Sequence, residues 1–476
     1  MSEGRGLEKY DLVVVGGGEC GLAAAKQGAD LGARVALAEP GAMGGTCLNR
    51  GCIPKKALVR SAYIYHLMGK AVDFGVRSLV PALDWQMVIE RKDRLVRQLE
   101  REKRRSLEAR SIPVLRGRAS FLSPHDLTVG EVLVQADNIV LAVGSRVASI
   151  PVPGAELAMT SDHALAMREL PESVLIVGGG VIAMEFAHIW NRAGVSVTVL
   201  EIGDRILAAM DDQVAEELTR LSSERGIEII THGRLEQITR EDGGLSARAQ
   251  LPGGFREIGC SVVLLAAGRV PNIAGLGLEA AGVQVDRGRV VVDEYLQTNV
   301  SHIYCGGDAI GGHCLAPVAA YDGRLATRNA LRGNVEVTDY SIVPYTVFST
   351  PPVSSVGLTE FQARAAGGQV EVSVLPMATV ECAVVEGETE GFIKIVADAD
   401  SGRIRGGHIV GARSEELIHI IAVAMKGKLT CGELAEIIPV HPSFSEGVVE
   451  TARRSPAAGL VAFEQRLGEP RPGGMV

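Results

Sequence analysis

The chain has 476 residues, a formal net charge of −9, and a composition that is 46% hydrophobic, 4% aromatic and rich in glycine (57 residues). This length predicts roughly two to four domains with their own cores, and the composition argues against a disordered or fibrous protein. The negative charge makes nucleic acid an unexpected partner, and no apolar run approaches the roughly 20 residues that a membrane span needs.

The chain begins with MSEGRGLEKY, which lacks the apolar core of a secretory signal peptide. We therefore expect a cytoplasmic protein. Structural disulfides are rare in the cytosol, so two cysteines close together in this sequence favour redox chemistry over structural cross-linking.

The first predicted unit covers residues 11–40, DLVVVGGGECGLAAAKQGADLGARVALAEP, and reads as a buried strand, a glycine turn, a helix and a second strand. Gly16, Gly18 and Gly21 form a G-x-G-x-x-G pattern, and the second strand ends in Glu39. Such glycines let the backbone approach a pyrophosphate at a helix N-terminus, and the acid binds ribose hydroxyls. The unit predicts a dinucleotide site.

The next segment, GGTCLNRGCIPKK, places Cys47 and Cys52 five positions apart. Zinc ligands in knuckles are typically separated by about two to four residues and have a second Cys/His pair nearby, which this sequence lacks. We predict no metal site and instead a disulfide that is made and broken. A helix that starts here, with lysine charge beside it, would lower the pKa of a thiol.

Two later segments, a charged run and a second strand–turn–helix–strand unit, have different interpretations. The run ERKDRLVRQLEREKRR (90–105) is basic, but acids interleave at helical spacing, which favours a solvated helix face. Residues 173–201 repeat the strand–turn–helix–strand design at an offset of 162, with Gly178, Gly180, Ala183 and Glu201 in the motif positions. Two dinucleotide sites suggest two cofactors that exchange electrons.

These motifs, with GGGVIAMEFA, LAAGRVPN, IYCGGDAIGG and HPSFSE following in order, resemble the flavoprotein disulfide reductases (class I pyridine nucleotide-disulfide oxidoreductases). That family includes dihydrolipoamide dehydrogenase, glutathione reductase and mercuric reductase. The resemblance covers nearly the whole chain and implies FAD on the first unit and NAD on the second. The implied fold is α/β: two Rossmann-like domains and a C-terminal α+β dimerisation domain. Its expected parts are 1–150 (FAD-binding domain, first part), 151–269 (NAD-binding domain), 270–339 (FAD/central domain, second part) and 340–476 (dimerisation domain).

The resemblance assigns roles to the residues around the cysteine pair. Cys47 is the outer thiol that attacks substrate, and Cys52 is the inner thiol that faces the flavin. One of Lys55 and Lys56 reaches the flavin ring and pairs with Glu185, and both lysines stay open because family members differ in which position carries this role.

Other family positions concern proton transfer and cofactor binding. His441 and Glu446 in HPSFSE resemble an acid/base dyad, in which a carboxylate orients a histidine whose pKa can be tuned towards neutrality. In the family this histidine comes from the partner subunit, so a homodimer is expected. Asp308 resembles the acid on the FAD ribityl chain. The remaining implied cofactor contacts are Gly45, Thr46, Gly117, Gly268 and Ala316.

The end of the second unit favours NAD over NADP. A carboxylate at Glu201 binds free ribose hydroxyls and repels a 2′-phosphate. NADP-using relatives carry basic residues at the places of Ile202 and Gly203, whereas Arg205, four positions after the acid, points the other way.

Further positions separate the branches of the family. Glutathione reductases usually have tyrosine at the place of Val181, and the place of their glutathione-contacting tyrosine corresponds to Lys103. The PKK sequence, in contrast, resembles the glutathione branch. No N-terminal metal-binding module precedes the first unit, and no cysteine follows Cys431, which disfavours mercuric reductase.

We therefore predict an NAD-linked, FAD-containing dithiol/disulfide oxidoreductase most like dihydrolipoamide dehydrogenase, acting on a small-molecule or lipoyl-domain substrate. The alternative is a glutathione reductase-like or mercuric reductase-like enzyme that reduces another low-molecular-weight disulfide or a metal ion. A different class, a non-catalytic flavoprotein scaffold, would need neither the cysteine pair nor the His-Glu dyad.

Overall fold

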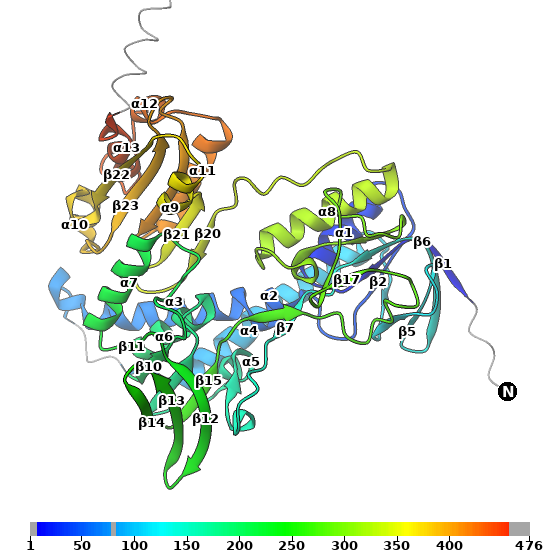
Figure 1. Cartoon of the computed structure of the whole chain (residues 1–476), viewed down its shortest axis with the longest axis horizontal. Helices are drawn as coiled ribbons and strands as arrows, with labels where there is room; N and C mark the ends of the chain where they lie inside the picture. Colours follow the sequence, from blue (N-terminus) through cyan, green and yellow to red (C-terminus); the bar gives the residue numbers. More distant parts are fainter. Residues whose placement is uncertain (1–6, 78–81, 457–476) are drawn as a thin grey trace, which may run out of the picture. The chain divides into compact units, whose positions relative to one another are not determined.

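The computed structural model describes residues 7–77 and 82–456 (Figure 1). The first six residues of the segment used to predict location, and the end of the predicted dimerisation domain, lie outside these ranges. The chain divides into two compact units, Met1–Pro171 with Leu264–Asp339, and Glu172–Val263 with Tyr340–Val476. Each unit is described by itself below.

The first unit is built on a mostly parallel sheet with the order β3-β2-β1-β6-β5-β4, in which β19 also pairs with β6. Strands β1, β2, β3, β6 and β19 pair in parallel, while β4 and β5 are antiparallel. The strands are β1 (Glu8–Val15), β2 (Val35–Ala38), β3 (Val114–Leu115), β4 (Ala119–Phe121), β5 (Asp126–Val129), β6 (Val132–Leu141) and β19 (Ile303–Cys305).

Alternating side chains of β1 reach the two faces of this sheet. Val13 and Val15 belong to one hydrophobic cluster, and Leu12 and Val14 belong to another, as the two-residue repeat of a strand requires. Because both faces are covered, the strand reads in the sequence as the continuous apolar run LVVV.

Helices and short strands complete the first unit, and α1 packs along α8. The helices are α1 (Glu19–Asp30), α2 (Gly45–Arg50), α3 (Cys52–Gly69), η1 (Ala71–Phe74), α4 (Trp85–Glu108), η2 (Ala155–Leu157), α5 (Ser161–Ala166), η3 (Gly307–Ile310) and α8 (Ala316–Arg332). The remaining pairs are β7 (Ser145–Val147) with β16 (Arg269–Pro271), β8 (Met159–Thr160) with the last residues of β15 (Val262–Leu265), and β17 (Val285–Asp286) with β18 (Arg289–Val290).

The second unit contains the second dinucleotide-binding motif. Strands β9 (Ser173–Val177), β10 (Ser196–Leu200) and β11 (Glu228–Ile230) pair in parallel. Helix α6 (Val181–Arg192) connects β9 to β10, and helix α7 (Asp212–Glu224) lies between β10 and β11 in the chain. An antiparallel ribbon follows, formed by β12 (Arg234–Glu241), β13 (Gly244–Leu251) and β14 (Gly254–Cys260) (Figure 1).

The C-terminal part of the second unit is α+β. Its antiparallel sheet has the order β20-β21-β24-β23-β22, and α11 and α13 pack against its strands. The strands are β20 (Tyr345–Val347), β21 (Val353–Gly357), β22 (Val370–Pro376), β23 (Phe392–Asp398) and β24 (Ile404–Val410). The helices are α9 (Glu360–Ala365), η4 (Met377–Thr379), α10 (Glu381–Glu386), α11 (Ser414–Lys426), α12 (Cys431–Ala435) and α13 (Ser445–Arg453). The predicted α/β fold class, with a C-terminal α+β part, is confirmed. The predicted domain boundaries stay a prediction.

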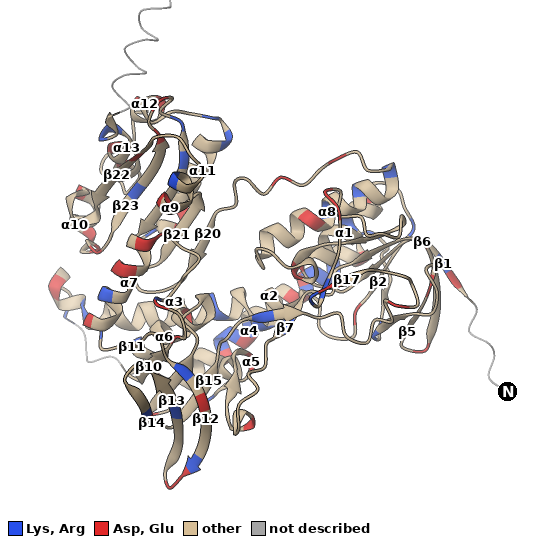
Figure 2. Cartoon of the chain, viewed as in Figure 1, with Lys and Arg blue, Asp and Glu red and all other residues tan. Residues whose placement is uncertain are grey.

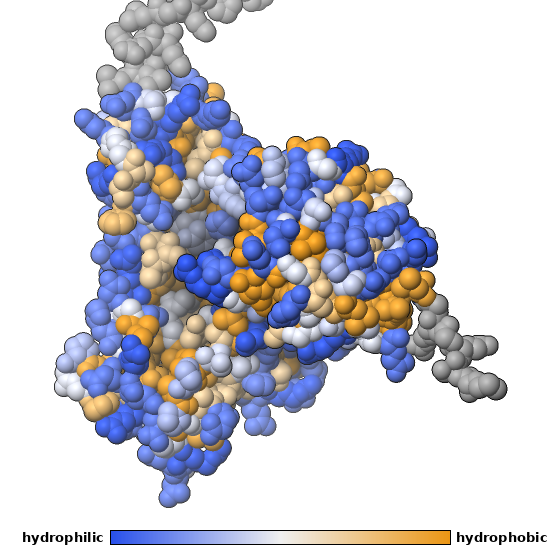
Figure 3. Space-filling view, turned by 45° about the vertical axis from the view of Figure 1, so that its right-hand side comes forward, coloured by the Kyte–Doolittle hydropathy of each residue, from blue (hydrophilic) through white to orange (hydrophobic). Residues whose placement is uncertain are grey.

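Charged and apolar residues are interspersed in the views that Figures 2 and 3 give of the described residues. Basic and acidic residues occur along the same elements (Figure 2), and Arg104 pairs with Glu100 on α4. The run 90–105 is not solvated throughout, because Lys92 is buried and donates to the Leu165 carbonyl. On the visible face, groups of apolar side chains lie among hydrophilic ones (Figure 3). None of the helices in the described part of the chain combines the length and apolar character needed to cross a membrane.

Candidate functional site

The first glycine turn, between β1 and α1, is packed so closely against its own backbone that two of its positions have no room for a side chain. Gly16 has φ +113°, and a Cβ at this position would lie 2.3 Å from the Ala142 carbonyl oxygen. A Cβ at Gly21 would lie 1.7 Å from the Gly16 carbonyl oxygen. Gly18 caps α1, whose free N–H groups and dipole favour an anion.

Glu39 is fixed at the mouth of this turn. Its Oε2 accepts a hydrogen bond from Gly17 N at 2.7 Å, and its Oε1 accepts one from Gly41 N at 2.6 Å. A turn shaped by glycine, a helix N-terminus and a carboxylate at the end of the second strand together fit a dinucleotide such as FAD.

A polar network lies beside this turn within the first unit. Asp308, in η3, accepts a hydrogen bond from Ser145 Oγ at 2.5 Å. Arg269 donates to the same Ser145 oxygen at 2.8 Å and to Thr46 Oγ1 at 3.3 Å. The network brings the predicted residues Asp308 and Thr46 together. Ser145 and Arg269 were not selected from the sequence, although Arg269 stands in the motif LAAGRVPN.

Three other predicted cofactor contacts occupy special backbone positions in the first unit. Gly117 has φ +148° and Gly268 has φ +108°, both in the region that favours glycine. Ala316 is the first residue of α8. These conformations are compatible with backbone contacts to a ligand, and the contacts themselves stay a prediction.

The two predicted redox cysteines lie where two helices meet. Cys47 lies in α2 and is half-buried, while Cys52 is exposed and is the first residue of α3. Both are reduced thiols in this structure, and their side chains hydrogen-bond to each other. That hydrogen bond, then burial and the charges of Cys52 and Glu19, raise the pKa of Cys47, whereas Lys103 lowers it. The N-terminal position of Cys52 favours a thiolate there.

The first turn of α3 also carries the predicted lysines. Lys55 is buried and Lys56 is partly exposed. Glu185, on α6 in the second unit, is 3% exposed, and its Oε1 accepts a hydrogen bond from Phe348 N at 3.2 Å. The predicted pairing of Glu185 with one of the two lysines stays a prediction.

The predicted acid/base dyad is formed in the second unit. His441 Nδ1 lies 2.8 Å from Glu446 Oε1, and the other oxygen of Glu446 accepts from Ser443 N at 2.8 Å. The hydrogen bond and charge of Glu446 raise the pKa of His441. The backbone N–H of Ser443 and then His441 lower the pKa of Glu446. The imidazole is 65% exposed and its Nε2 is available to a partner, with Glu381 at 3.8 Å.

The second glycine turn repeats the first. Gly178 has φ +112°, Gly180 caps α6, and Ala183 is fully buried in the place of the third glycine. Glu201 accepts hydrogen bonds from Gly179 N and, at 2.6 Å, from Gly203 N. Glu201, the acid predicted to bind ribose, is therefore held by two backbone N–H groups, as Glu39 is.

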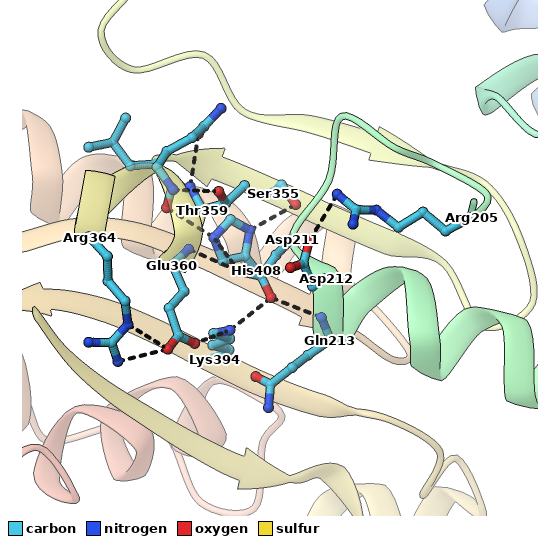
Figure 4. Close-up of polar contacts among 12 residues, drawn as sticks. Arg205, Asp211, Asp212, Gln213, Ser355, Thr359, Glu360, Arg364, Lys394 and His408 are labelled. Carbon is cyan, nitrogen blue, oxygen red and sulfur yellow. Dashed lines mark hydrogen bonds and ion pairs between the residues drawn. The ribbon is translucent and has the colours of Figure 1, made fainter. Parts of the chain in front are cut away.

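Arg205, which pointed towards NADP in the sequence, is held by the next helix. Its Nη2 lies 2.9 Å from Asp212 Oδ1, and the same nitrogen donates to the Ala208 carbonyl at 3.4 Å. Figure 4 shows the side chain extending from the loop before α7 towards Asp212. This pairing supports the NAD interpretation, because the guanidinium already has an anionic partner.

A buried ion cluster, formed by Asp211, Glu360 and Lys394, was missed by the sequence interpretation (Figure 4). Lys394 of β23 is 1% exposed, and its Nζ lies 2.8 Å from both Asp211 Oδ1 and Glu360 Oε2. Asp211 also caps α7 by accepting from Gln213 N. No sequence signal identifies it, because its three residues, which lie 34 to 183 positions apart, meet only in the folded unit.

We also searched the described residues for side chains that could bind a metal ion. Among the residues that the structure describes, no group of three or more His, Cys, Asp or Glu side chains is arranged to hold a metal ion.

Comparison with known proteins identifies the family. The profile described as pyridine nucleotide-disulphide oxidoreductase matches residues 10–323, and the profile of its dimerisation domain matches residues 343–452. The chain belongs to this family. As a pyridine nucleotide-disulphide oxidoreductase it is an FAD-containing, NAD(P)-dependent enzyme, which confirms the predicted family and cofactors. It also carries the dimerisation domain that the sequence predicted.

Individual relatives of this oxidoreductase carry different names. It is 36% identical over 462 residues to a dihydrolipoyl dehydrogenase of Bacillus subtilis (strain 168), with 93% of this chain and 97% of that protein covered. It is 32% identical over 443 residues to a mercuric reductase of Bacillus cereus, covering 92% and 70%. The Cu(II) complex of the HOCl-induced flavoprotein disulfide reductase RclA from Escherichia coli superposes with a TM-score of 0.86 at 31% identity, covering 94% and 99%.

Proposed function

We propose that this chain is an NAD-linked, FAD-dependent dithiol/disulfide oxidoreductase most like dihydrolipoamide dehydrogenase. The observation that supports this proposal is the hydrogen-bonded pair Cys47 and Cys52 at the start of α3, beside the first glycine turn. The 36% identity to the dihydrolipoyl dehydrogenase of Bacillus subtilis agrees with it.

The cysteines exchange electrons with substrate through sulfur–sulfur bonds. In dithiol oxidation, a substrate thiolate attacks Sγ of Cys47 in the Cys47–Cys52 disulfide, and Cys52 leaves as a thiolate. The second substrate thiolate then attacks the mixed disulfide, releasing the substrate disulfide and Cys47. Two electrons have moved to the cysteine pair. Disulfide reduction is the same sequence in reverse.

His441 moves the protons of this exchange. Its Nδ1 is occupied by Glu446, so Nε2 is the nitrogen that can take a proton from a substrate thiol or return it. Following the family, we propose that His441 of the partner subunit serves Cys47, and hence that the active form is a homodimer.

The cofactors would be held by the two glycine turns. FAD, when bound, supplies two-electron transfer between the cysteine pair and the nicotinamide. Glu39 would bind a ribose of FAD, Asp308 would bind its ribityl chain, and Lys55 or Lys56 would approach its ring. Glu201 would bind the ribose of NAD and disfavour NADP.

The remaining proposals concern the surroundings of the enzyme. We propose a cytoplasmic location, where the cellular environment keeps the thiols of such a cysteine pair available for redox chemistry.

The second candidate for the function is a glutathione reductase-like or mercuric reductase-like enzyme. The PKK sequence, which resembles the glutathione branch, and the 32% identity to the mercuric reductase of Bacillus cereus favour this candidate.

A substrate panel tests the proposal. Lipoamide with NADH, dihydrolipoamide with NAD⁺, glutathione disulfide and Hg²⁺ are compared, each with both nicotinamides. We expect lipoamide to be the best substrate, and Cys47→Ser or Cys52→Ser to abolish turnover while FAD content is retained. Full activity in either variant would remove the central claim, and preference for another disulfide or for Hg²⁺ would select the second candidate.

A further inference from the structure

An ion pair that the proposed chemistry does not use lies next to the outer thiol. Lys103 of α4 contacts Glu19, the first residue of α1, with Nζ 2.7 Å from Oε1. Their side chains are only 25% and 23% exposed. A half-buried ion pair is screened less by solvent and salt than a surface pair, so its charges act on neighbouring groups.

The backbone brings this pair to Cys47. A Cβ added to Gly45 would lie 2.6 Å from the Cα of Gly18, so the start of α2 touches the start of α1. Gly44 N also donates to the Gly17 carbonyl at 2.8 Å. Glu19 directly follows Gly18, Cys47 comes two residues after Gly45, and α2 packs against α4.

The other charged groups around Cys47 are already engaged. Arg50 of α2 pairs with Asp162 of α5 at 3.5 Å, and Arg269 donates to Thr46 Oγ1. On α4, Glu100 accepts from Arg104 and from Met43 N. From α3, the facing titratable group is Cys52 itself. Within one chain, Glu19 and Lys103 are the charged side chains besides Cys52 that act on the Cys47 thiol, with opposite signs. In the proposed homodimer, the partner subunit's His441 would also face this thiol.

We propose that Lys103, held in place by Glu19, is a positioning residue that sets the reactivity of Cys47 by favouring its thiolate. This rests on the proposed function, in which Cys47 exchanges with substrate. Lys103 stabilises the negative sulfur and Glu19 opposes it, so the position of the lysine decides the balance. The thiolate is the species that attacks a disulfide.

Site-resolved alkylation of the reduced holoenzyme tests this directly. The rate of iodoacetamide reaction at Cys47, identified by peptide mass, is measured from pH 5 to 10. We expect Lys103→Met to move the rate profile to higher pH and to slow alkylation at pH 7. A rise of one pKa unit lowers the thiolate fraction tenfold but makes the thiolate about threefold more nucleophilic, so the net slowing is about threefold. Glu19→Gln should shift the profile to lower pH and accelerate alkylation.

Matched variants separate charge from structure. Lys103→Arg should keep the profile, because it keeps the charge. Arg104→Met removes the neighbouring cation of the same helix and should leave the profile unchanged. Opposite shifts for Lys103→Met and Glu19→Gln, with unchanged FAD content, are the expected result. Shifts in the same direction, or no shift in either variant, overturn the proposal. If Lys103→Met does not fold, Glu19→Gln and Lys103→Arg still decide.

Cys47→Ser distinguishes this inference from the proposed function. If Cys47→Ser retains disulfide reduction, the proposed function is wrong. If it is inactive while the alkylation profiles do not move, only the role of Lys103 is wrong.

Discussion

Glu201 accepts hydrogen bonds from two backbone N–H groups, so its carboxylate is fixed at the end of β10. Arg205 forms an ion pair with Asp212 rather than with the carboxylate of Glu201. We therefore expect kcat/KM with NADH to exceed that with NADPH by at least about tenfold, since the lost ribose contact and the charge clash together cost more than ~1.4 kcal/mol. Glu201→Ala should narrow the ratio. Steady-state kinetics with both nicotinamides checks this, and an NADPH preference in the unchanged enzyme would contradict it.

The His441–Glu446 pair predicts how kcat/KM for dithiol oxidation depends on pH. Glu446 raises the pKa of His441, so the histidine keeps its proton to higher pH than it would alone. A base must be unprotonated, so kcat/KM for dithiol oxidation should fall as pH drops through this raised pKa. In Glu446→Gln the cause of the shift is removed, and the acidic limb should move to lower pH.

The pH dependence of dithiol oxidation in the two proteins is the measurement. His441→Ala is the reference, and it should lose about 10²- to 10⁴-fold in rate. An acidic limb that stays in place in Glu446→Gln would show that another group controls the profile.

At the scale of elements, the buried cluster of Asp211, Glu360 and Lys394 joins the start of α7 to β23 and α9 within the second unit. Removing Lys394 leaves the 2% exposed Asp211 without its cation. We expect Lys394→Met to lower the free energy of unfolding by about 3–5 kcal/mol, because breaking a buried ion pair leaves an uncompensated charge.

Urea denaturation of Lys394→Met and of Arg220→Met tests this difference. Arg220 also pairs with two carboxylates, Glu217 and Glu224, but its side chain is 52% exposed, so its loss should cost only about 0–1 kcal/mol. Equal losses in the two variants would show that the buried cluster contributes no more than a surface pair.

The same cluster contributes a pH-dependent stability. Burial raises the pKa of Asp211, but hydrogen bonds from Lys394 and from Glu360 N outweigh it and leave the pKa lowered. A lowered carboxylate pKa gives stability that is present above the unfolded pKa of about 4 and is lost as pH falls through the folded value. Part of the acid sensitivity of unfolding should therefore disappear in Lys394→Met.

At the scale of the whole molecule, we propose that the two subunits of the homodimer share their active sites. Cys47 belongs to the first unit, whereas His441 lies in the dimerisation domain, and a base must come within about 3 Å of the thiol it serves. We expect the Cys47→Ser homodimer to be inactive and the His441→Ala homodimer to lose about 10²- to 10⁴-fold in rate. When the two are unfolded and refolded together, each mixed dimer should contain one intact site.

Activity and association are measured on the same refolded mixture. Recovery of up to half of the normal sites per mixed dimer supports sites shared between subunits. A tag on one variant shows whether mixed dimers form, and mixed dimers without activity would contradict the shared arrangement.

The sequence by itself determined the features that depend on local chemistry. The two glycine turns, their terminal acids Glu39 and Glu201, and the start of a helix beside the cysteines follow from short-range patterns, because neighbouring backbone groups dictate them. The His441–Glu446 pairing is likewise local, since the two residues are five positions apart. The family resemblance extended these motifs to roles that no spacing could supply.

Only the tertiary structure decided which distant side chains meet. Lys103 reaches Glu19 across 84 positions, Arg269 reaches Thr46 across 223, and Lys394 reaches Asp211 across 183. Thr46 and Arg269 stand in family motifs, but the local sequence does not show which distant residue each will contact. An ordinary surface lysine and a lysine that will be buried beside a carboxylate have the same neighbours in the chain. The folded sheets and helices fix their distances and burial, and through these the strength of each charge.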